Sequence, residues 1–393
     1  MSKPKIRFNG FTEDWEQRKL GDVATEMIAG GDINKEKVVE NGKYPIYANA
    51  LTNDGIVGYY DEYYRVKAPA VTVTGRGDVG HAQARTLDFT PVVRLLAIRS
   101  EHNIYFLENA INNHGVFVES TGVPQLTVPQ LGKYMISFPE TIEEEKKIGE
   151  YFHALDHLIT LHQRKCEQTK KLKKFMLQKM FPQNGKAVPE IRFNGFTEDW
   201  EQRKLSEVAT MHARIGWQNL RTSEFLDSGE YMLITGTDFD DGRVNYDTCH
   251  YVEEERYEQD KHIQIKNGSI LITKDGTLGK VAYIQGLPMP ATLNAGVFNV
   301  VIKDEKQVDG KYLFQYLKAP FLMDYVNEKA TGGTIKHLNQ NILVDFPVML
   351  PFVDEQVMLG RYFEALDDLI TLHQRKCDEL QNMKKFMLQN MFV

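Results

Sequence analysis

The chain has 393 residues, of which 42% are hydrophobic and 26% are charged, a composition that suits a folded protein of two or three domains. No apolar run approaches the roughly 18 residues that a membrane span needs, so a cytoplasmic location is expected. The formal net charge of −7 excludes a uniformly basic surface, and any site for an anionic partner must be a local patch.

A segment near the start of the chain returns later. Residues 6–20 read IRFNGFTEDWEQRKL, and the same letters recur at residues 191–205, an offset of 185. The similarity then fades, so one invariant segment introduces two different stretches of chain. Because Trp15 and Trp200 recur in identical context, we interpret them as residues that dock each domain to the helices predicted below.

Each repeated segment is followed by a variable stretch, residues 21–138 and residues 206–350, which predicts a mixture of strands and helices. Short β-branched or apolar runs between glycine-rich turns predict strands, for example at residues 70–74, 269–273 and 298–302. Helical spacing is found in each stretch, near residues 103–116 and 311–329.

A long helix is predicted after each variable stretch. Residues 151–181 return at residues 362–392 with an offset of 211 and 22 of 31 positions identical. Apolar positions recur mostly in alternating steps of four and three, the pattern of a coiled-coil seam. The predicted seam comprises Ile148, Phe152, Leu155, Ile159, His162, Cys166, Thr169, Leu172 and Met176 in the first copy, and Leu359, Phe363, Leu366, Ile370, His373, Cys377, Leu380, Met383 and Met387 in the second.

These helices predict a rigid spacer. A helix over residues 143–181 would be about 58 Å long at about 1.5 Å per residue. We expect antiparallel pairing, because each helix follows its own domain and this arrangement puts the domains at opposite ends. His162 and His373 are expected to be packing residues of the seam, and the charged triplet Glu144-Glu145-Lys146 is expected to be solvated.

The predicted fold class is α+β, with two mixed α/β domains, two long antiparallel coiled-coil helices between them and an internal pseudo-twofold repeat. The first domain is assigned to residues 1–140 and the first helix to residues 141–183. The second domain is assigned to residues 184–350 and the second helix to residues 351–393. A pseudo-twofold axis in one chain matches the axis that relates the two strands of DNA.

Catalytic signatures are absent from the sequence. It contains neither the Asp/Asn-Pro-Pro-aromatic signature of adenine methyltransferases nor a glycine-rich nucleotide loop, and the stretch from Gly276 to Lys280 has the wrong spacing for a phosphate loop. Cys166, Cys249 and Cys377 lack the spacing of zinc ligands and are expected to be reduced thiols. We therefore expect a protein that is not an enzyme and holds neither a cofactor nor a metal ion.

Two matched turns are the first candidates for a binding role. Residues 71–80, VTVTGRGDVG, correspond to residues 270–279, ILITKDGTLG, at an offset of 199. A strand that ends in glycines lets backbone approach a ligand closely, and Arg or Lys there can reach guanine or a phosphate. The candidate DNA-binding residues of these turns are Thr74, Arg76, Asp78, Thr273, Lys274, Asp275, Thr277 and Lys280. A plain tight turn with solvated charges is the alternative.

A second matched pair precedes the long helices, at residues 121–126 and 331–338. Gln125 suits adenine, Lys336 suits guanine or a phosphate, and His337 is adjacent to it, although such residues could equally cap the following segment. Weaker candidates, chosen by residue type and expected loop placement, are Tyr47, Asn49 and Asn53 in the first domain and Arg214, Gln218 and Thr237 in the second.

These features together resemble the specificity subunits of type I restriction and modification systems. The resemblance rests on the doubled IRFNGFTEDWEQRKL, the doubled ALDxLITLHQRK at residues 154–165 and 365–376, and the TGVPQLT and TGGTIKHLN turns, and it covers essentially the whole chain. It implies two target-recognition domains that read the halves of a bipartite site in double-stranded DNA. It also implies two methyltransferase subunits and two restriction subunits as partners, which bind S-adenosylmethionine and ATP themselves.

Other functions stay open at this stage. A DNA-recognition subunit of a related methyltransferase or restriction system without the type I motor has the same features. A coiled-coil assembly adaptor would keep the helices but would have no use for two divergent domains. A stand-alone enzyme would need a catalytic cluster that the sequence does not show. The recognised bases do not follow from the resemblance, because the recognition stretches are the divergent part.

Overall fold

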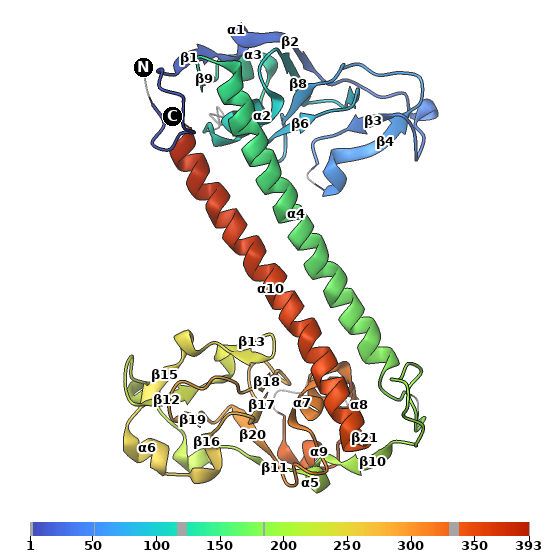
Figure 1. The fold of residues 1–393 in the computed structure, drawn as a ribbon, viewed down its shortest axis with the longest axis vertical. Helices are drawn as coiled ribbons and strands as arrows, with labels where there is room; N and C mark the ends of the chain where they lie inside the picture. The colour runs from blue at the N-terminus through green and yellow to red at the C-terminus, as the bar shows by residue number, and fades with distance from the viewer. Residues whose placement is uncertain (1–2, 51, 116–123, 184, 330–337, 393) are drawn as a thin grey trace. The chain divides into compact units, whose positions relative to one another are not determined.

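The computed structural model describes residues 3–50, 52–115, 124–183, 185–329 and 338–392 (Figure 1). The chain divides into two compact units. Unit 1 comprises Met1–Lys165 and His373–Val393, and unit 2 comprises Cys166–Leu372. Each unit therefore contains one variable stretch and one half of each long helix. Among the described residues, no helix is long and apolar enough to cross a bilayer.

Unit 1 is built on a four-stranded antiparallel sheet in the order β2-β8-β5-β6. Its strands are β2 (Ala24–Ala29), β8 (Leu95–Ser100), β5 (Ala70–Thr74) and β6 (Ala82–Arg85). A three-stranded sheet comprises β4 (Ile56–Tyr60), β3 (Tyr44–Tyr47) and β7 (Thr90–Pro91), and a two-stranded sheet comprises β1 (Glu16–Lys19) and β9 (Met135–Phe138). The short helices are α1 (Leu20–Val23), α2 (Ile104–Asn113), α3 (Val128–Gly132), η1 (Lys35–Lys37) and η2 (Thr52–Gly55).

Unit 2 repeats this order with additions. Its four-stranded sheet comprises β11 (Ala209–His212), β20 (Val297–Ile302), β17 (Ile270–Thr273) and β18 (Val281–Tyr283). A second sheet comprises β15 (His250–Val252), β12 (Tyr231–Ile234), β19 (Ala291–Leu293) and β16 (Gln264–Ile265), and β10 (Glu201–Lys204) pairs with β21 (Pro347–Leu350). The hairpin of β13 (Phe239–Asp240) and β14 (Arg243–Val244) belongs to the longer connection between β12 and β15.

The helices of unit 2 follow the same plan. They are α5 (Leu205–Val208), α6 (Glu254–Glu258), α7 (Gly310–Lys318), α8 (Pro320–Lys329) and α9 (Gln340–Val344), with short 3-10 helices η3 (Gly216–Gln218), η4 (Thr222–Glu224), η5 (Gly236–Asp238), η6 (Tyr246–Thr248) and η7 (Lys261–Ile263). By chain order and capping, α7 is the counterpart of α2, because each helix follows the matched strand and is capped by a side chain, Asn103 for α2 and Asp309 for α7.

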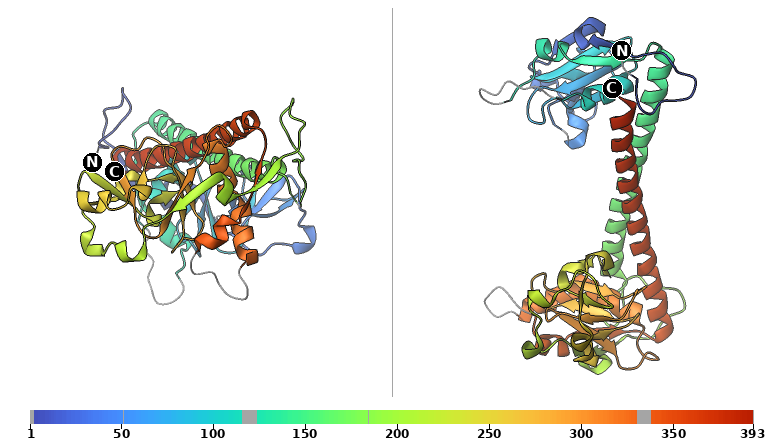
Figure 2. Two further views of the ribbon diagram at one scale, coloured as in Figure 1. Left: turned by 90° about the horizontal axis from the view of Figure 1, so that it is seen from below. Right: turned by 90° about the vertical axis from the view of Figure 1, so that its left-hand side faces the viewer.

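The two long helices are α4 (Ile142–Lys179) and α10 (Val353–Met391). Within each unit they lie side by side and run in opposite directions (Figures 1 and 2). In unit 1 the ammonium of Lys384 donates to both carboxylate oxygens of Asp156, at 2.6 and 2.7 Å. In unit 2 Lys173 donates to Asp367 at the same two distances. Since these pairs are related by the repeat offset of 211, the predicted antiparallel pairing is confirmed within each unit.

The seam departs from the predicted register toward the C-terminal end of each helix. Leu172 and Met383 are exposed, while the adjacent Lys173 is buried in unit 2. A helix with 3.6 residues per turn drifts by about 20° per heptad from a strict seven-residue repeat, so the facing position moves by one residue. The middle of the seam follows the prediction, since His162 and His373 are half-buried with their Nδ1 atoms 3.0 Å apart.

Close contact between the long helices and the short ones depends on two glycines at equivalent positions. A Cβ atom on Gly149 of α4 would lie 2.2 Å from the Asn103 Oδ1 that caps α2. A Cβ atom on Gly360 of α10 would lie 2.9 Å from the Tyr312 backbone nitrogen of α7. A side chain at either position would separate the capped helix from the long helix.

The repeated segments dock to the long helices, as predicted for their tryptophans. The Trp15 ring packs edge-on against Phe392, and the Trp200 ring packs edge-on against Phe181, its equivalent in the other helix repeat. The segments also carry an arginine that the sequence gives no reason to single out. Arg7 binds both oxygens of Glu144 at 2.6 and 2.8 Å.

The repeat of this ion pair corrects one expectation. Arg192 binds Glu355 in unit 2 in the same bidentate way, with both distances 2.8 Å. Glu144 and Glu145 are buried rather than solvated, because Arg7 neutralises the first and His102 Nδ1 lies 2.7 Å from the second. The acidic first turn of each helix is thus an attachment point for the repeated segment.

Candidate nucleic-acid interface

The turn between β5 and β6 in unit 1 is held by one buried hydroxyl. Thr74 Oγ1 donates to the Asp78 carbonyl and accepts from the His81 amide at 3.0 Å. The Thr74 carbonyl accepts from the Gly80 amide at 2.8 Å. Thr74 itself is buried, so its side chain shapes the turn, whereas Arg76 and Asp78 are exposed.

The turn between β17 and β18 in unit 2 has the same hydrogen bonds. Thr273 Oγ1 donates to the Thr277 carbonyl and accepts from the Lys280 amide at 3.0 Å, and the Thr273 carbonyl accepts from the Gly279 amide at 2.9 Å. Thr277 and Lys280 are exposed. The matched letters of the sequence therefore correspond to one turn geometry that carries different side chains.

The second matched segments lie directly against these turns. The Leu126 amide donates to the Gly75 carbonyl at 2.9 Å, and the Leu338 amide donates to the Lys274 carbonyl at 2.8 Å. Gln125 is exposed beside the turn of unit 1. The structure thus brings together, in each unit, two regions that the sequence singled out separately. Lys336 and His337 lie outside the described residues.

Backbone conformation explains one glycine in each turn. Gly77 and Gly276 have φ values of 82° and 73°, in the left-handed region, and a Cβ on either would meet nothing within 4 Å. The glycines are therefore required by conformation rather than by crowding. The open space beside them leaves the backbone accessible to a ligand.

Lys274 and Asp275 occupy the positions equivalent to Gly75 and Arg76. Both are half-buried, and the Lys274 ammonium lies 5.5 Å from the centre of the Phe298 ring. A groove of about 470 Å³ opens beside them in unit 2. Ile215 and Gln340 also line this groove, and neither was among the residues predicted from the sequence. The position of Gln340 just after the second matched segment is the signal that could have identified it.

The weaker candidates of unit 1 mostly contact residues of their own domain. Tyr47 ends strand β3 instead of lying in a loop, and its buried ring is covered by the Arg85 guanidinium at 3.6 Å. Asn49 donates to the Val93 carbonyl at 3.0 Å and accepts from the Gly75 amide at 2.9 Å. Asn53 is exposed and donates to the Ile56 carbonyl. Asn49 is therefore a support of the turn, and Tyr47 presents no free face to a base.

The weaker candidates of unit 2 show the same tendency. Arg214 is buried and donates from Nε to the Leu293 carbonyl at 3.0 Å, and burial lowers the pKa of its guanidinium. Gln218 is also buried. Thr237 is exposed, with its hydroxyl 2.6 Å from that of Thr235. Arg214 is a structural residue at the floor of the groove, because its donors already have acceptors within the domain.

The family comparison identifies the family of this chain. The family model described as "Type I restriction modification DNA specificity domain" matches residues 12–171 and again residues 197–382. The chain belongs to this family. The two matches each contain one variable stretch and most of the helix that follows it, in agreement with the doubling seen in the sequence.

Individual relatives agree with this assignment. The chain is 22% identical over 398 residues to the type I restriction enzyme MjaVIII specificity subunit of Methanocaldococcus jannaschii, a match that covers 95% of this chain and 91% of that protein. A putative MjaX specificity subunit from the same organism is 22% identical, with 97% of this chain and 93% of that protein covered. Both matches extend over nearly the whole chain.

The fold is also found among solved structures. The crystal structure of the S subunit of a type I restriction-modification system from M. genitalium matches with a TM-score of 0.73 and 15% identity, covering 100% of this chain and 99% of that one. The predicted α+β fold with long paired helices is confirmed by this likeness. Within the described ranges, no group of three or more His, Cys, Asp and Glu residues is arranged to hold a metal ion.

Proposed function

We propose that this specificity subunit recognises a bipartite site in double-stranded DNA and directs two methyltransferase subunits and two restriction subunits to it, without catalysing a reaction itself. The observation that carries the proposal is the pair of turns with one hydrogen-bonding frame and different side chains. Two readers of different half-sites need such an arrangement, because the frame sets the position and the side chains set the preferred base.

The side chains of the two turns suit different bases. In unit 1 Arg76 offers the two parallel donors that fit the O6 and N7 acceptors of guanine. In unit 2 the equivalent residue is Asp275, and a carboxylate accepts from the amino group of cytosine. Lys280 and Thr277 of the same turn are exposed and can bind phosphate or a base edge. The groove beside Asp275 gives a neighbouring base room to enter.

Exposed apolar residues on the long helices support the proposed methyltransferase partners. In unit 1 these include Leu158 and Leu161 of α4 with Met383 and Phe386 of α10, and in unit 2 they include the equivalents Leu369 and Leu372 of α10 with Leu172 and Phe175 of α4. A spacing of three residues places the two members of each pair on one face of their helix. Two equivalent sets suit two copies of one partner that buries them.

The net charge of −7 fits a recognition subunit that shares its DNA contacts with partners. Most of the nonspecific affinity for DNA comes from lysine and arginine contacts to phosphate. A chain with 47 basic and 54 acidic residues supplies few such contacts by itself. We therefore expect the methyltransferase subunits to contribute much of the phosphate binding.

Methylation of a randomised duplex library tests the proposal. The chain is assembled with its methyltransferase subunits and S-adenosylmethionine, and the methylated molecules are sequenced. We expect one site with two specified halves and unspecified bases between them, and no methylation by the chain alone. A single uninterrupted site would contradict the proposal that each turn recognises one half-site. Methylation by the chain alone would contradict a non-catalytic role.

A further inference from the structure

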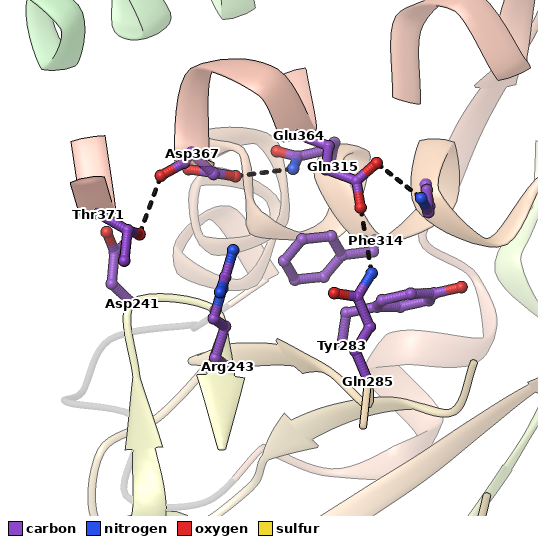
Figure 3. Close-up of a pocket in the computed structure, with 11 residues that line it drawn as sticks. Asp241, Arg243, Tyr283, Gln285, Phe314, Gln315, Glu364, Asp367 and Thr371 are labelled. Carbon is purple, nitrogen blue, oxygen red and sulfur yellow. Dashed lines mark hydrogen bonds and ion pairs between the residues drawn. The ribbon is translucent and has the colours of Figure 1, made fainter. Parts of the chain in front are cut away.

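Each unit has a cleft at the outer edge of its four-stranded sheet, and the two clefts differ. In unit 1 the cleft lies between β6, α2 and α4 and has a volume of about 540 Å³. In unit 2 the equivalent space between β18, α7 and α10 is reduced to about 30 Å³ (Figure 3). The clefts correspond residue by residue through the repeat, since Asp156 in the first is the equivalent of Asp367 in the second.

The chain's own β13–β14 hairpin fills the cleft of unit 2. The Gly242 carbonyl at its tip accepts a hydrogen bond of 3.0 Å from the Tyr283 amide of the edge strand β18. The ammonium of Lys318 on α7 lies 2.7 Å from the carbonyl and 3.0 Å from the carboxylate of Asp241. Arg243 reaches Asp368 of α10 at 2.5 Å. The turn that contains Asp241 thus adds to the edge of β18, and ion pairs connect the hairpin to α7 and to α10.

The packing around this turn is close. A Cβ on Gly242 would lie 2.9 Å from the ring of Phe314 and 2.8 Å from the ammonium of Lys318. Figure 3 shows Asp241 and Arg243 of the hairpin on the side of the pocket where Asp367 lies, with Phe314 and Tyr283 to their right. The cleft of unit 2 therefore shows how a peptide turn can occupy this position in the fold.

In unit 1 the carboxyl group of Glu108 lies beside the strand residue whose equivalent in unit 2 donates to the Gly242 carbonyl of the hairpin. Ala84 of β6 is the equivalent of Tyr283, and its backbone lies close enough to the carboxyl group of Glu108 on α2 to oppose the effect of burial on the pKa of that carboxyl. Phe314 is the residue equivalent to Glu108 in unit 2. The connection between β3 and β4 is short, at residues 48–55, whereas the hairpin of unit 2 lies within residues 235–249. Asn112 of α2 already accepts from the Ala82 amide at 2.8 Å and donates to the Ala82 carbonyl at 2.9 Å, so a peptide can add to the edge of β6 only beside Ala84.

The charge of the open cleft differs from that of the filled one. Its lining includes five basic or imidazole side chains: His81, His153, His157, Arg164 and Lys384. Asp156 and Lys384 neutralise each other in an ion pair of 2.6 Å, and burial raises the pKa of Glu108 to about 7 and lowers the pKa of His81. In unit 2 the positions of His153 and His157 are taken by Glu364 and Asp368. Among the described lining residues, Arg164 is the cation outside the ion pair of Asp156 and Lys384, and it therefore favours an acidic occupant of the open cleft.

We propose that the cleft of unit 1 receives a turn of a methyltransferase subunit with an acidic side chain at its tip, in the place that the β13–β14 hairpin fills in unit 2. The inference rests on the proposed function, which supplies the partner. The carbonyl of the entering turn accepts from the Ala84 amide, beside which the Glu108 carboxyl group now lies, as in the addition of a strand to a sheet edge. Consequently the two methyltransferase subunits make unequal contacts, and unit 1 offers a contact that unit 2 provides internally.

Hydrogen exchange measured by mass spectrometry tests the placement. The complete chain is compared alone, with the purified methyltransferase subunit, and with duplex DNA. We expect slower exchange in residues 80–86 when the methyltransferase subunit is added, and no comparable change in the equivalent residues 279–285, whose edge is already covered. Protection of residues 80–86 by DNA alone would overturn the proposal in favour of a nucleic-acid contact.

A pair of matched variants tests the charge. Arg164→Glu places a carboxylate in the open cleft, and Arg375→Glu makes the same change at the equivalent exposed residue of α10, in the same HQRK context. We expect Arg164→Glu to weaken binding of the methyltransferase subunit about tenfold and Arg375→Glu to change it by about twofold at most. Melting temperatures close to that of the wild type establish that both variants fold.

Two failures are distinguishable. If the wild-type chain forms the complex but residues 80–86 stay unprotected, or if the two variants lose affinity equally, the inference about the cleft is overturned while the proposed function stands. If the wild-type chain forms no complex with the methyltransferase subunit, the proposed function fails and the inference fails with it.

Discussion

Thr74 and Thr273 are the single residues on which the shape of the two turns depends most. In unit 2 the Thr273 hydroxyl donates to the Thr277 carbonyl and accepts from the Lys280 amide. Thr273→Val keeps the shape of the side chain but removes both bonds at a buried position, so we expect a loss of about 1 to 3 kcal/mol in the free energy of unfolding. Thr277→Val, at an exposed residue of the same turn, is the control and should change it by less than about 0.5 kcal/mol. Equal losses in thermal unfolding would contradict this account of the turn.

Glu108 makes stability depend on pH. Burial raises the pKa of this carboxyl from 4.5 to about 7. The folded chain therefore holds the proton more tightly than the unfolded chain, and the resulting stabilisation is complete below about pH 4.5 and lost as the pH rises through about 7. Glu108→Gln cannot ionise, so its stability relative to the wild type should increase between about pH 5 and 8, by at most about 3 kcal/mol. Chemical unfolding at several pH values measures this, and a constant difference would show that Glu108 does not titrate in that range.

For single residues, the sequence predicts where the candidate residues lie better than it predicts what their side chains contact. The matched turns are predicted, and Arg76, Asp78, Thr277 and Lys280 are exposed there. The buried ion pair of Arg7 and Glu144 is not predicted, because its partners are 137 positions apart and a charged helix turn usually faces solvent. Which polar residue turns inward depends on the carbonyls and charges that the fold brings near it, and these are distant in the sequence.

At the scale of elements, each long helix has a buried packing face and an exposed apolar face. Leu155 and Leu366 are equivalent and buried, whereas Leu158 and Leu369, one turn further, are exposed. Leu155→Asp and Leu366→Asp should each cost several kcal/mol, because a buried charge has no partner there. Leu158→Asp and Leu369→Asp should leave the melting temperature nearly unchanged but weaken binding of the methyltransferase subunits. Unchanged melting of the first pair, determined by calorimetry, would remove Leu155 and Leu366 from the seam.

The helices also show how far a sequence pattern can be extended. Steps of three and four residues predict the seam correctly through Phe152, Leu155 and His162. The same pattern fails at Leu172, because the drift of the helix places Lys173 inside instead. Lys173 is accommodated by its bonds to Asp367, a partner 194 positions away. A buried lysine in a predicted surface position can be recognised only when that partner is known.

At the scale of the whole molecule, most of the predicted architecture follows from the internal repeat. The offsets of 185, 199 and 211 by themselves predict two domains, two turns and two helices. The offsets do not show what the extra residues of the second domain do. In the structure part of that extra chain forms the β13–β14 hairpin, which fills a cleft left open in unit 1. An insertion that packs against a distant edge strand has no local signal in the sequence.

The central claim is that each unit reads one half of the DNA site through its own turn. The most direct measurement is methylation of a library randomised across both half-sites by the assembled complex, carried out with the wild type, Arg76→Ala and Asp275→Ala. We predict that each variant relaxes base preference at one half-site only, by about 1 to 3 kcal/mol of discrimination, and that the two variants affect opposite halves. A uniform loss across both half-sites, or a change at the same half-site for both variants, would contradict the claim.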